Sequence, residues 1–205
     1  EQGNIKAQFE LGEAYLKGKG VLQDYEEAVK WYLLAANEGD MKSQATLGYI
    51  YYEGRGVSRN KKKGVYWYGL AAKQGDTASQ SKLGKIYSEG NGVLKSYEQA
   101  IKWYLLAADQ GSAEAQSSLG ELYAKGQGVS QNAQEAVKWY MLAADQGSTE
   151  AQFSLGEIYA KGQGVSQNLQ EAVKWYHLAA EQGRAEAQSS LGAMYAEGTG
   201  VEKNY

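Results

Sequence analysis

Residues 113–147 read AEAQSSLGELYAKGQGVSQNAQEAVKWYMLAADQG, and this stretch holds the pattern that decides the fold. The pattern returns along the chain at a constant interval. The dipeptide Leu-Gly begins at positions 11, 47, 83, 119, 155 and 191, which are 36 residues apart. The tryptophans keep the same interval, at positions 31, 67, 103, 139 and 175. A fixed period of this length is typical of a repeat architecture.

Each unit predicts a helix, a glycine turn and a second helix. In the first unit Ala7, Leu11 and Tyr15 lie on one apolar helical stripe. Trp31 and Tyr32 belong to a second stripe after the turn. One helix pair cannot bury both stripes alone, so neighbouring pairs must stack. The sequence therefore predicts an all-α fold, a solenoid of 36-residue helix-turn-helix repeats.

Capping residues recur with the same period. Residues that favour the N-cap precede each expected second helix, namely Asp24, Asn60, Ser96, Asn132, Asn168 and Asn204. Glycines that can end it follow, namely Gly39, Gly75, Gly111, Gly147 and Gly183. These residues predict where the second helices begin and end.

The repeats predict one continuous array over residues 1–205. The expected units are 4–39, 40–75, 76–111, 112–147 and 148–183, with a partial unit at 184–205. Residues 1–3 match the end of a second helix, and Tyr205 matches Tyr25 at the start of another. We therefore interpret the chain as a segment of a longer array, from which any upstream signal peptide has been removed.

The repeated residues resemble the Sel-one-like repeat (SLR) family, which is related to the tetratricopeptide repeat. The shared pattern is A-x-A-Q-x-x-L-G-x-x-Y-x-x-G-x-G-V, then A-x-x-W-Y-x-x-A-A-x-x-G, and it covers the whole chain. The resemblance implies a right-handed superhelix that serves as a protein-interaction scaffold. Relatives include quality-control adaptors, bacterial envelope and exopolysaccharide assembly proteins, and host-interaction factors of pathogens. This chain lacks the proline that often follows the turn, and the cysteine pair of the disulfide-stapled branch.

The composition argues against catalysis and metal binding. There is no cysteine and one histidine, which removes thiolate nucleophiles, cysteine zinc sites and multi-histidine metal sites. His177 stands where other units carry Leu, Gly or Met, so we expect a partly exposed helix residue. The Gly-x-Gly turns lack the Gly-Lys-Ser/Thr of a phosphate-binding loop. We predict no catalytic residue and no cofactor; turnover lost on changing His177 or Glu157 would revive the enzyme alternative.

Departures from the repeat indicate where a partner binds. By similarity to tetratricopeptide arrays, the first-helix face opposite the apolar stripe lines a concave groove. The candidate residues on that face are Phe9, Tyr49, Tyr52, Lys85 and Phe153. Exposed aromatic residues in a groove are the usual anchors of a peptide or loop. The alternative is a varied surface on an array that binds elsewhere.

The second unit is strongly basic. Residues 40–75 sum to 7 − 2 = +5, whereas the whole chain sums to 21 − 24 = −3. The candidate cations are Arg55, Arg59, Lys61, Lys62 and Lys63. Three of them occupy the first turn of the second helix, where the helix dipole favours carboxylates. Gly64 and Gly69 replace Ala28 and Leu33, at a cost of about 1 kcal/mol of helix propensity each, with no compensation visible in the sequence.

This basic edge predicts an acidic protein partner or, alternatively, an anionic lipid headgroup such as a phosphoinositide. Drift within a tolerant repeat is the third interpretation. Nucleic acid is not expected, because the preceding unit, residues 4–39, sums to 4 − 6 = −2 and would repel phosphates within the Debye length of roughly 8–10 Å.

Together with these features, the resemblance to the SLR family implies a non-catalytic protein–protein interaction scaffold from a bacterium, one that binds a host or partner protein and is associated with virulence. The alternative is a structural component of bacterial envelope or polysaccharide assembly. No apolar run approaches the roughly 18 residues of a membrane span. A periplasmic or secreted location is favoured over the cytoplasm, and the lack of cysteine fits all three.

Overall fold

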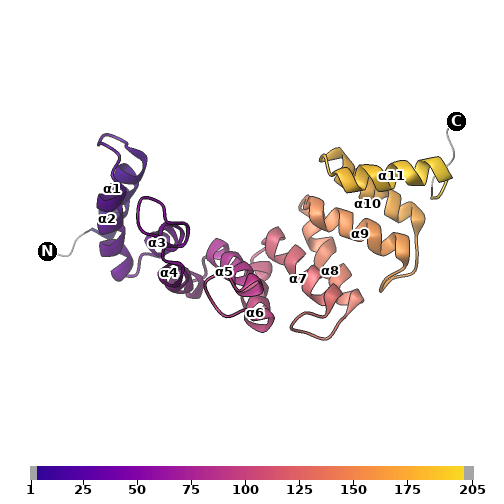
Figure 1. Ribbon diagram of the computed structural model, residues 1–205, viewed down its shortest axis with the longest axis horizontal. Coiled ribbons are helices and arrows are strands. Elements are labelled where there is room, and N and C mark those ends of the chain that lie inside the picture. The colour runs from indigo at the N-terminus through magenta and orange to yellow at the C-terminus, as the bar shows by residue number, and fades with distance from the viewer. Residues whose placement is uncertain (1–3, 201–205) are drawn as a thin grey trace. The chain divides into compact units, whose positions relative to one another are not determined.

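The structure is a computed structural model that describes residues 4–200, and within this range every regular element is an α-helix (Figure 1). The predicted cap Asn204, and the matches at residues 1–3 and at Tyr205, lie outside the described residues. The helices are α1 Ile5–Lys17, α2 Tyr25–Asn37, α3 Met41–Glu53, α4 Lys61–Lys73, α5 Thr77–Glu89, α6 Tyr97–Asp109, α7 Ala113–Lys125, α8 Ala133–Asp145, α9 Thr149–Lys161, α10 Leu169–Glu181 and α11 Ala185–Glu197. They pack into two compact units, which divide between Leu106 and Ala107.

The helix ends lie where the capping residues predicted them. The side chains of Asp24, Asn60, Ser96, Asn132 and Asn168 accept hydrogen bonds from backbone N–H groups in the first turn of the second helices. The five glycines expected to follow these helices all have positive φ, from 85° at Gly147 to 101° at Gly75. These polar caps and glycines satisfy backbone groups that each helix end leaves without a partner.

A contact between glycine and tyrosine joins the two helices of each pair. The glycine of Leu-Gly on the first helix lies directly against the tyrosine of Trp-Tyr on the second. A Cβ atom added to Gly48 would lie 2.6 Å from Cδ1 of Tyr68, closer than any real Cβ contact. The equivalent contacts are Gly12–Tyr32, Gly84–Tyr104, Gly120–Tyr140 and Gly156–Tyr176. Only glycine lets the two helix axes come this close.

The Gly-x-Gly turns join one pair to the next within each unit. The second glycine of the turn has positive φ and lies against the start of the preceding second helix. A Cβ atom on Gly92 (φ 94°) would lie 2.7 Å from Cβ of Lys61. Gly56 and Gly164 make the same approach to Tyr25 and Ala133. Positive φ and close packing thus both require glycine at this position.

Buried glutamine side chains add polar contacts between repeats. Nε2 of Gln44 donates to the carbonyl oxygen of Ala36 at 3.0 Å. Nε2 of Gln74, later in the same repeat as Gln44, donates to Oε1 of Gln44 at 2.7 Å and to the carbonyl oxygen of Gly39, in the preceding repeat, at 3.0 Å. The C-terminal unit repeats this pattern with Gln152, Ala144, Gln182 and Gly147. Each buried amide therefore has partners on two sides, which fixes the register between neighbouring pairs.

The glycine contact predicts opposite effects of two alanine substitutions in one repeat. Gly48→Ala should lower the free energy of unfolding by about 1–2 kcal/mol, because the clash with Tyr68 outweighs the gain in helix propensity. Gly69→Ala is the matched control, since an added Cβ there meets nothing within 4 Å. It should raise stability by about 0.5–1 kcal/mol. Urea denaturation followed by circular dichroism measures both, and a shift of the same sign in both variants would contradict this account.

The buried tyrosines predict a loss of stability in alkali. Burial raises the pKa of Tyr140 to about 12, although a hydrogen bond with Ser154 opposes the rise. The folded state therefore favours the neutral phenol, and its contribution is complete below pH 10 and lost as the pH rises toward 12. Tyr140→Phe should remove about 1–2 kcal/mol of the loss in stability measured between pH 9 and pH 12. An identical pH profile in the variant would show that the phenol ionises freely in the folded protein.

Candidate partner-binding groove and basic edge

A groove of about 500 Å³ opens between the first helices of the N-terminal unit. Its walls are formed by Glu13 and Leu16 on α1, Ala45 and Tyr49 on α3, and Ala78 and Lys82 on α5. Tyr68, on the second helix α4, also lines the groove. Of the aromatic and basic residues predicted for a first-helix groove, Tyr49 lines this one.

Tyr49 is the accessible aromatic residue in this groove. Its side chain is 43% exposed. The guanidinium carbon of Arg55 lies 5.8 Å from the centre of its ring, within the range of a cation–π contact. Tyr49 therefore combines an exposed apolar ring with a neighbouring positive charge.

Tyr52 does not lie in the groove, so its prediction as an exposed anchor is wrong. Its side chain is 3% exposed, and its ring packs edge-on against Tyr68 with the ring centres 6.2 Å apart. Its hydroxyl donates to the carbonyl oxygen of Asn91 at 3.0 Å. Burial, together with the nearby Glu89 and Glu53, raises the pKa of Tyr52. The tyrosine contributes to packing between repeats.

Gly64 lies against the backbone of α3 at Tyr52. A Cβ atom on Gly64 would lie 2.7 Å from both N and Cβ of Tyr52. The missing methyl group therefore lets α4 approach the C-terminal part of α3. The expectation that Gly64 has no compensation is wrong, whereas a Cβ on Gly69 would meet open space.

The other predicted groove residues have different surroundings. Phe9 is half-buried and its ring lies 5.8 Å from that of Tyr32, so it belongs to the edge of the core. Lys85 is exposed on α5 and is not among the residues that line the groove. Their role in partner binding stays a prediction.

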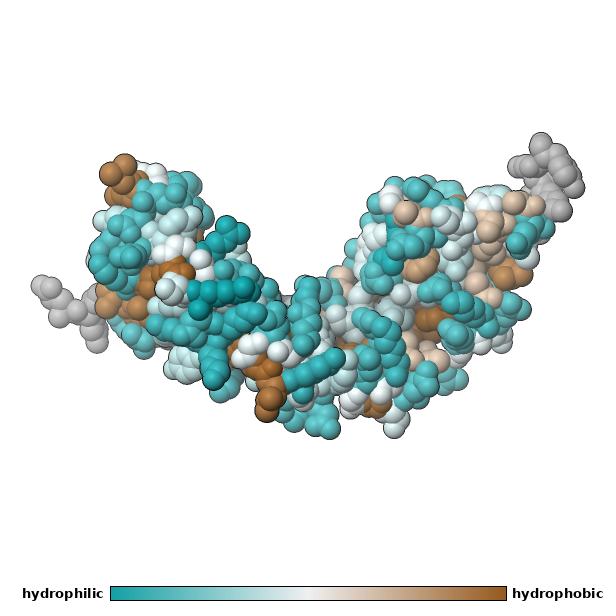
Figure 2. Space-filling view, in the orientation of Figure 1, coloured by the Kyte–Doolittle hydropathy of each residue, from teal (hydrophilic) through white to brown (hydrophobic). Residues whose placement is uncertain are grey.

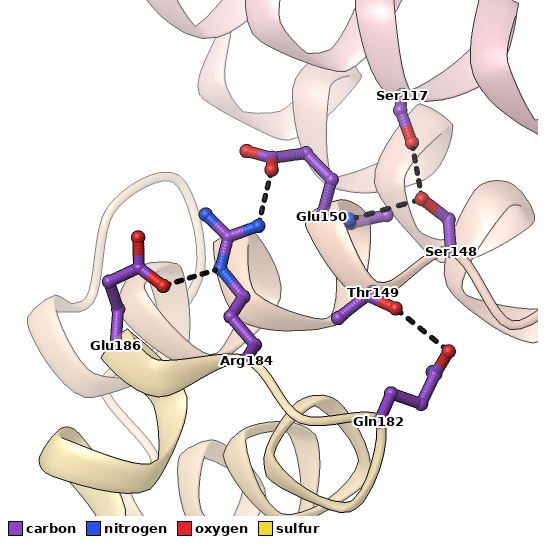
Figure 3. A network of polar contacts seen from close by, with 8 residues as sticks. Ser117, Ser148, Thr149, Glu150, Gln182, Arg184 and Glu186 are labelled. Carbon is purple, nitrogen blue, oxygen red and sulfur yellow. Dashed lines mark hydrogen bonds and ion pairs between the residues drawn. The ribbon is translucent and has the colours of Figure 1, made fainter.

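Phe153 is covered by a residue of the following repeat. The guanidinium carbon of Arg184 lies 4.4 Å from the centre of the Phe153 ring. Figure 3 shows this arginine between the carboxylates of Glu150 and Glu186, with which it forms ion pairs. Arg184 therefore occupies the space above Phe153 that a partner would have to enter.

Further hydrogen bonds hold the repeats together in the same region. The hydroxyls of Ser117 and Ser148 lie 2.9 Å apart, and the hydroxyl of Thr149 donates to Oε1 of Gln182 at 2.8 Å (Figure 3). Arg184 stands where the other first helices have a polar N-cap, and its side chain makes no capping bond to α11. This first-helix surface is thus occupied by contacts within the chain.

The five cations of the second repeat, residues 40–75, lie at the α3–α4 turn and the first turn of α4. Nζ of Lys63 lies 3.9 Å from the centre of the Tyr51 ring and donates to its hydroxyl at 2.8 Å. Lys61 donates to Oδ1 of Asn91. Nε of Arg59 donates to the carbonyl oxygen of Tyr52 at 3.1 Å. Lys62 and Lys63 are exposed, so the charge of this edge faces solvent.

Sequence reasoning missed Lys82. It lines the groove, pairs with Glu53 at 3.3 Å and lies 5.0 Å from the centre of the Tyr52 ring. The equivalent positions hold Glu10, Thr46, Ser118 and Ser154. Lys82 is therefore a cation at a position where these other repeats have no cation, and this difference could have identified it from the sequence.

The residues considered for catalysis are solvent-facing. On α10, Nδ1 of His177 lies 3.4 Å from Oε1 of Glu181. On α9, the carboxylate of Glu157 pairs with Nζ of Lys161 at 2.7 Å. Within residues 4–200, no three His, Cys, Asp or Glu side chains come together to form a metal site. None of the helices in this range has the length and apolar character to span a membrane.

Comparison with protein-family models finds six Sel1 repeats, at residues 5–40, 42–76, 77–112, 113–148, 149–183 and 185–205. The chain belongs to the Sel1 repeat family. Proteins built from Sel1 repeats mediate protein–protein interactions. The family resemblance of the sequence and the all-α repeat fold are thereby confirmed, whereas one continuous array stays a prediction.

Solved structures of bacterial Sel1 repeat proteins are highly similar. A protective antigen of uropathogenic Escherichia coli, which displays an SLR fold, has 38% identity and a TM-score of 0.94 over 99% of this chain. A Sel1 repeat protein from Oxalobacter formigenes has 38% identity and a TM-score of 0.91, again over 99%. This chain spans 44% of the antigen and 83% of the Oxalobacter protein. None of the curated proteins compared with the chain matches it.

The different burial of two neighbouring tyrosines predicts different effects on stability. Tyr52→Ala should lower the free energy of unfolding by about 3–5 kcal/mol, as is usual for a buried aromatic residue. Tyr49→Ala should change it by no more than about 0.5 kcal/mol, because the side chain is exposed. Thermal denaturation of the two variants measures this difference, and equal destabilisation would place both rings in the core.

Proposed function

We propose that this chain is a non-catalytic scaffold that binds a segment of another protein in the groove between α1, α3 and α5. The observation that carries the proposal is the exposed ring of Tyr49 in a groove built from three successive first helices. An aromatic residue that can be fully covered by a partner is the type of residue that contributes most to binding energy.

The walls of the groove suit an extended peptide or a loop. Leu16, Ala45 and Ala78 offer apolar contacts, and Glu13 and Lys82 offer charges of opposite sign on the two outer helices. Such a surface fixes both the position and the direction of a bound segment.

Two side chains fix the carboxylate of Glu13 at the wall of the groove. Its carboxylate accepts a hydrogen bond from the hydroxyl of Tyr32 at 2.8 Å and pairs with Lys17. Burial alone would raise the pKa of Glu13, but these two hydrogen bonds outweigh it and lower the pKa. The lowered pKa keeps the carboxylate charged at a lower pH than an ordinary glutamate, and its two partners fix its orientation.

We further propose that the partner is a host protein or another protein that a bacterium must bind during infection. The similar solved structures are bacterial, and one of them is a protective antigen of a uropathogenic strain. The identity of 38% over nearly the whole chain supports this setting.

Tyr49→Ala should weaken peptide binding in the groove. Peptides selected from a random display library on the wild-type chain should bind this variant about tenfold more weakly or worse, since an anchoring ring is worth at least about 1.4 kcal/mol. The matched control is Tyr66→Ala, because Tyr66 is 58% exposed on α4 and lies outside the groove. Fluorescence anisotropy with labelled selected peptides measures both affinities.

Equal binding by the wild type and by Tyr49→Ala would reject the groove as the binding site. Equal weakening by Tyr49→Ala and Tyr66→Ala would show that exposed tyrosines bind peptides without regard to position.

A further inference from the structure

The basic edge of the second repeat carries charge that the chain itself does not neutralise. We call Arg55, Arg59, Lys61, Lys62 and Lys63 the second-repeat cations. Across the described residues, none of the five takes part in an ion pair. Their polar contacts go to neutral groups: a tyrosine hydroxyl, an asparagine amide and a backbone carbonyl.

Other repeats neutralise the equivalent lysines. On the second helices of the first, fourth and fifth repeats, a lysine pairs with a glutamate one turn earlier; the pairs are Lys30–Glu27, Lys138–Glu135 and Lys174–Glu171. In the second repeat the glutamate position holds Lys63 and the lysine position holds Tyr66. One charge of the pair is thus reversed and the other removed.

Tyrosine rings hold several of these cations without cancelling their charge. Lys63 lies over Tyr51, and Arg55 lies over Tyr49. Lys61 lies 5.9 Å from the centre of the Tyr52 ring. The ring faces attract a cation and limit its motion, while the net charge stays positive. An anionic ligand would therefore meet charges that are already positioned, which lowers the entropy cost of binding.

The arrangement is unfavourable for the chain in the absence of a ligand. Lys61, Lys62 and Lys63 occupy the first turn of α4, which has no acidic residue, and the helix dipole repels cations there. The cations also repel one another over a short stretch of backbone. A bound anion would relieve both effects at once.

We infer that the second-repeat cations bind an acidic segment of a partner protein. This inference rests on the proposed function, because it extends the protein-binding surface beyond the groove. The two surfaces are continuous: Arg55 contacts Tyr49, which lines the groove, and Lys82 and Lys61 both approach the ring of Tyr52. Figure 2 shows strongly hydrophilic side chains gathered over α3 and α4.

Charge favours a protein segment over an anionic membrane as the ligand. The preceding repeat, residues 4–39, carries 4 Lys and Arg against 6 Asp and Glu, a sum of −2. An anionic bilayer would repel this adjacent repeat, since a membrane surface extends beyond the five cations. A peptide segment contacts the cations alone and avoids this repulsion.

The test uses a short fluorescein-labelled peptide of alternating glutamate and glycine, with a glutamine version as its uncharged control. The triple variant Arg55→Glu, Lys62→Glu and Lys63→Glu reverses three exposed cations. The matched control is Lys125→Glu, Lys138→Glu and Lys161→Glu, which changes the net charge equally at three exposed lysines that are ion-paired with glutamate. Fluorescence anisotropy gives the affinities, and circular dichroism confirms that both variants fold.

The wild type should bind the glutamate peptide and not the glutamine peptide, and added NaCl should weaken binding. The first triple variant should bind at least about tenfold more weakly, and the control variant within about twofold of wild type. If the charge-reversed variant does not fold, Arg55→Gln, Lys62→Gln and Lys63→Gln should show the same loss in weaker form.

Several results would overturn the inference. These are equal loss in both triple variants, equal binding of the glutamine peptide, no binding of the acidic peptide, or binding to phosphatidylserine vesicles without binding to the peptide. Tyr49→Ala separates the two proposals. If this variant binds both the acidic peptide and the display-selected peptides as the wild type does, the groove is rejected and the second-repeat cations remain as the binding site.

Discussion

The structure depends on the contact between a glycine on the first helix of each repeat and a tyrosine ring on the second. Because Gly48 has no side chain, the ring of Tyr68 can approach the backbone of α3, and in the other described pairs an added Cβ would likewise lie 2.5–2.7 Å from the tyrosine ring. The helix axes are thereby held at one separation, and small alanine side chains can fill the space beside the rings. The Gly-x-Gly turn applies the same constraint between repeats, since Gly92 must lie against Lys61.

This constraint determines which surfaces can vary. The stripe that faces the partner helix and the glutamine contacts between repeats must recur, because each repeat supports the next. The outer face of the first helices and the turn edge carry no such requirement, so they can acquire a binding function without loss of the fold. The N-terminal unit has a groove with an exposed ring at Tyr49, whereas in the C-terminal unit Arg184 already covers Phe153.

The similarity to other Sel1 repeat proteins is consistent with this separation of roles. The antigen of uropathogenic Escherichia coli has 38% sequence identity to this chain at a TM-score of 0.94, over 99% of this chain. Fold is therefore retained while most side chains differ. Residues outside the repeating contacts can differ between members without loss of the fold, so fold similarity alone does not transfer what a member binds.

The sequence by itself determined the helices, their caps, the repeat length and the family, because those features follow from local spacing and backbone preference. Only the tertiary structure decided which side chains on the first-helix face are accessible. Tyr52 has the same place in its repeat as Leu16, yet it is buried, because Gly64 lets α4 approach and Asn91 comes from another repeat to accept its hydroxyl. Lys82 lines the groove, with Nζ 5.0 Å from the centre of the Tyr52 ring in the preceding repeat. The exposure of a side chain depends on how close the neighbouring helices lie, and the helical periodicity of the sequence does not predict that distance.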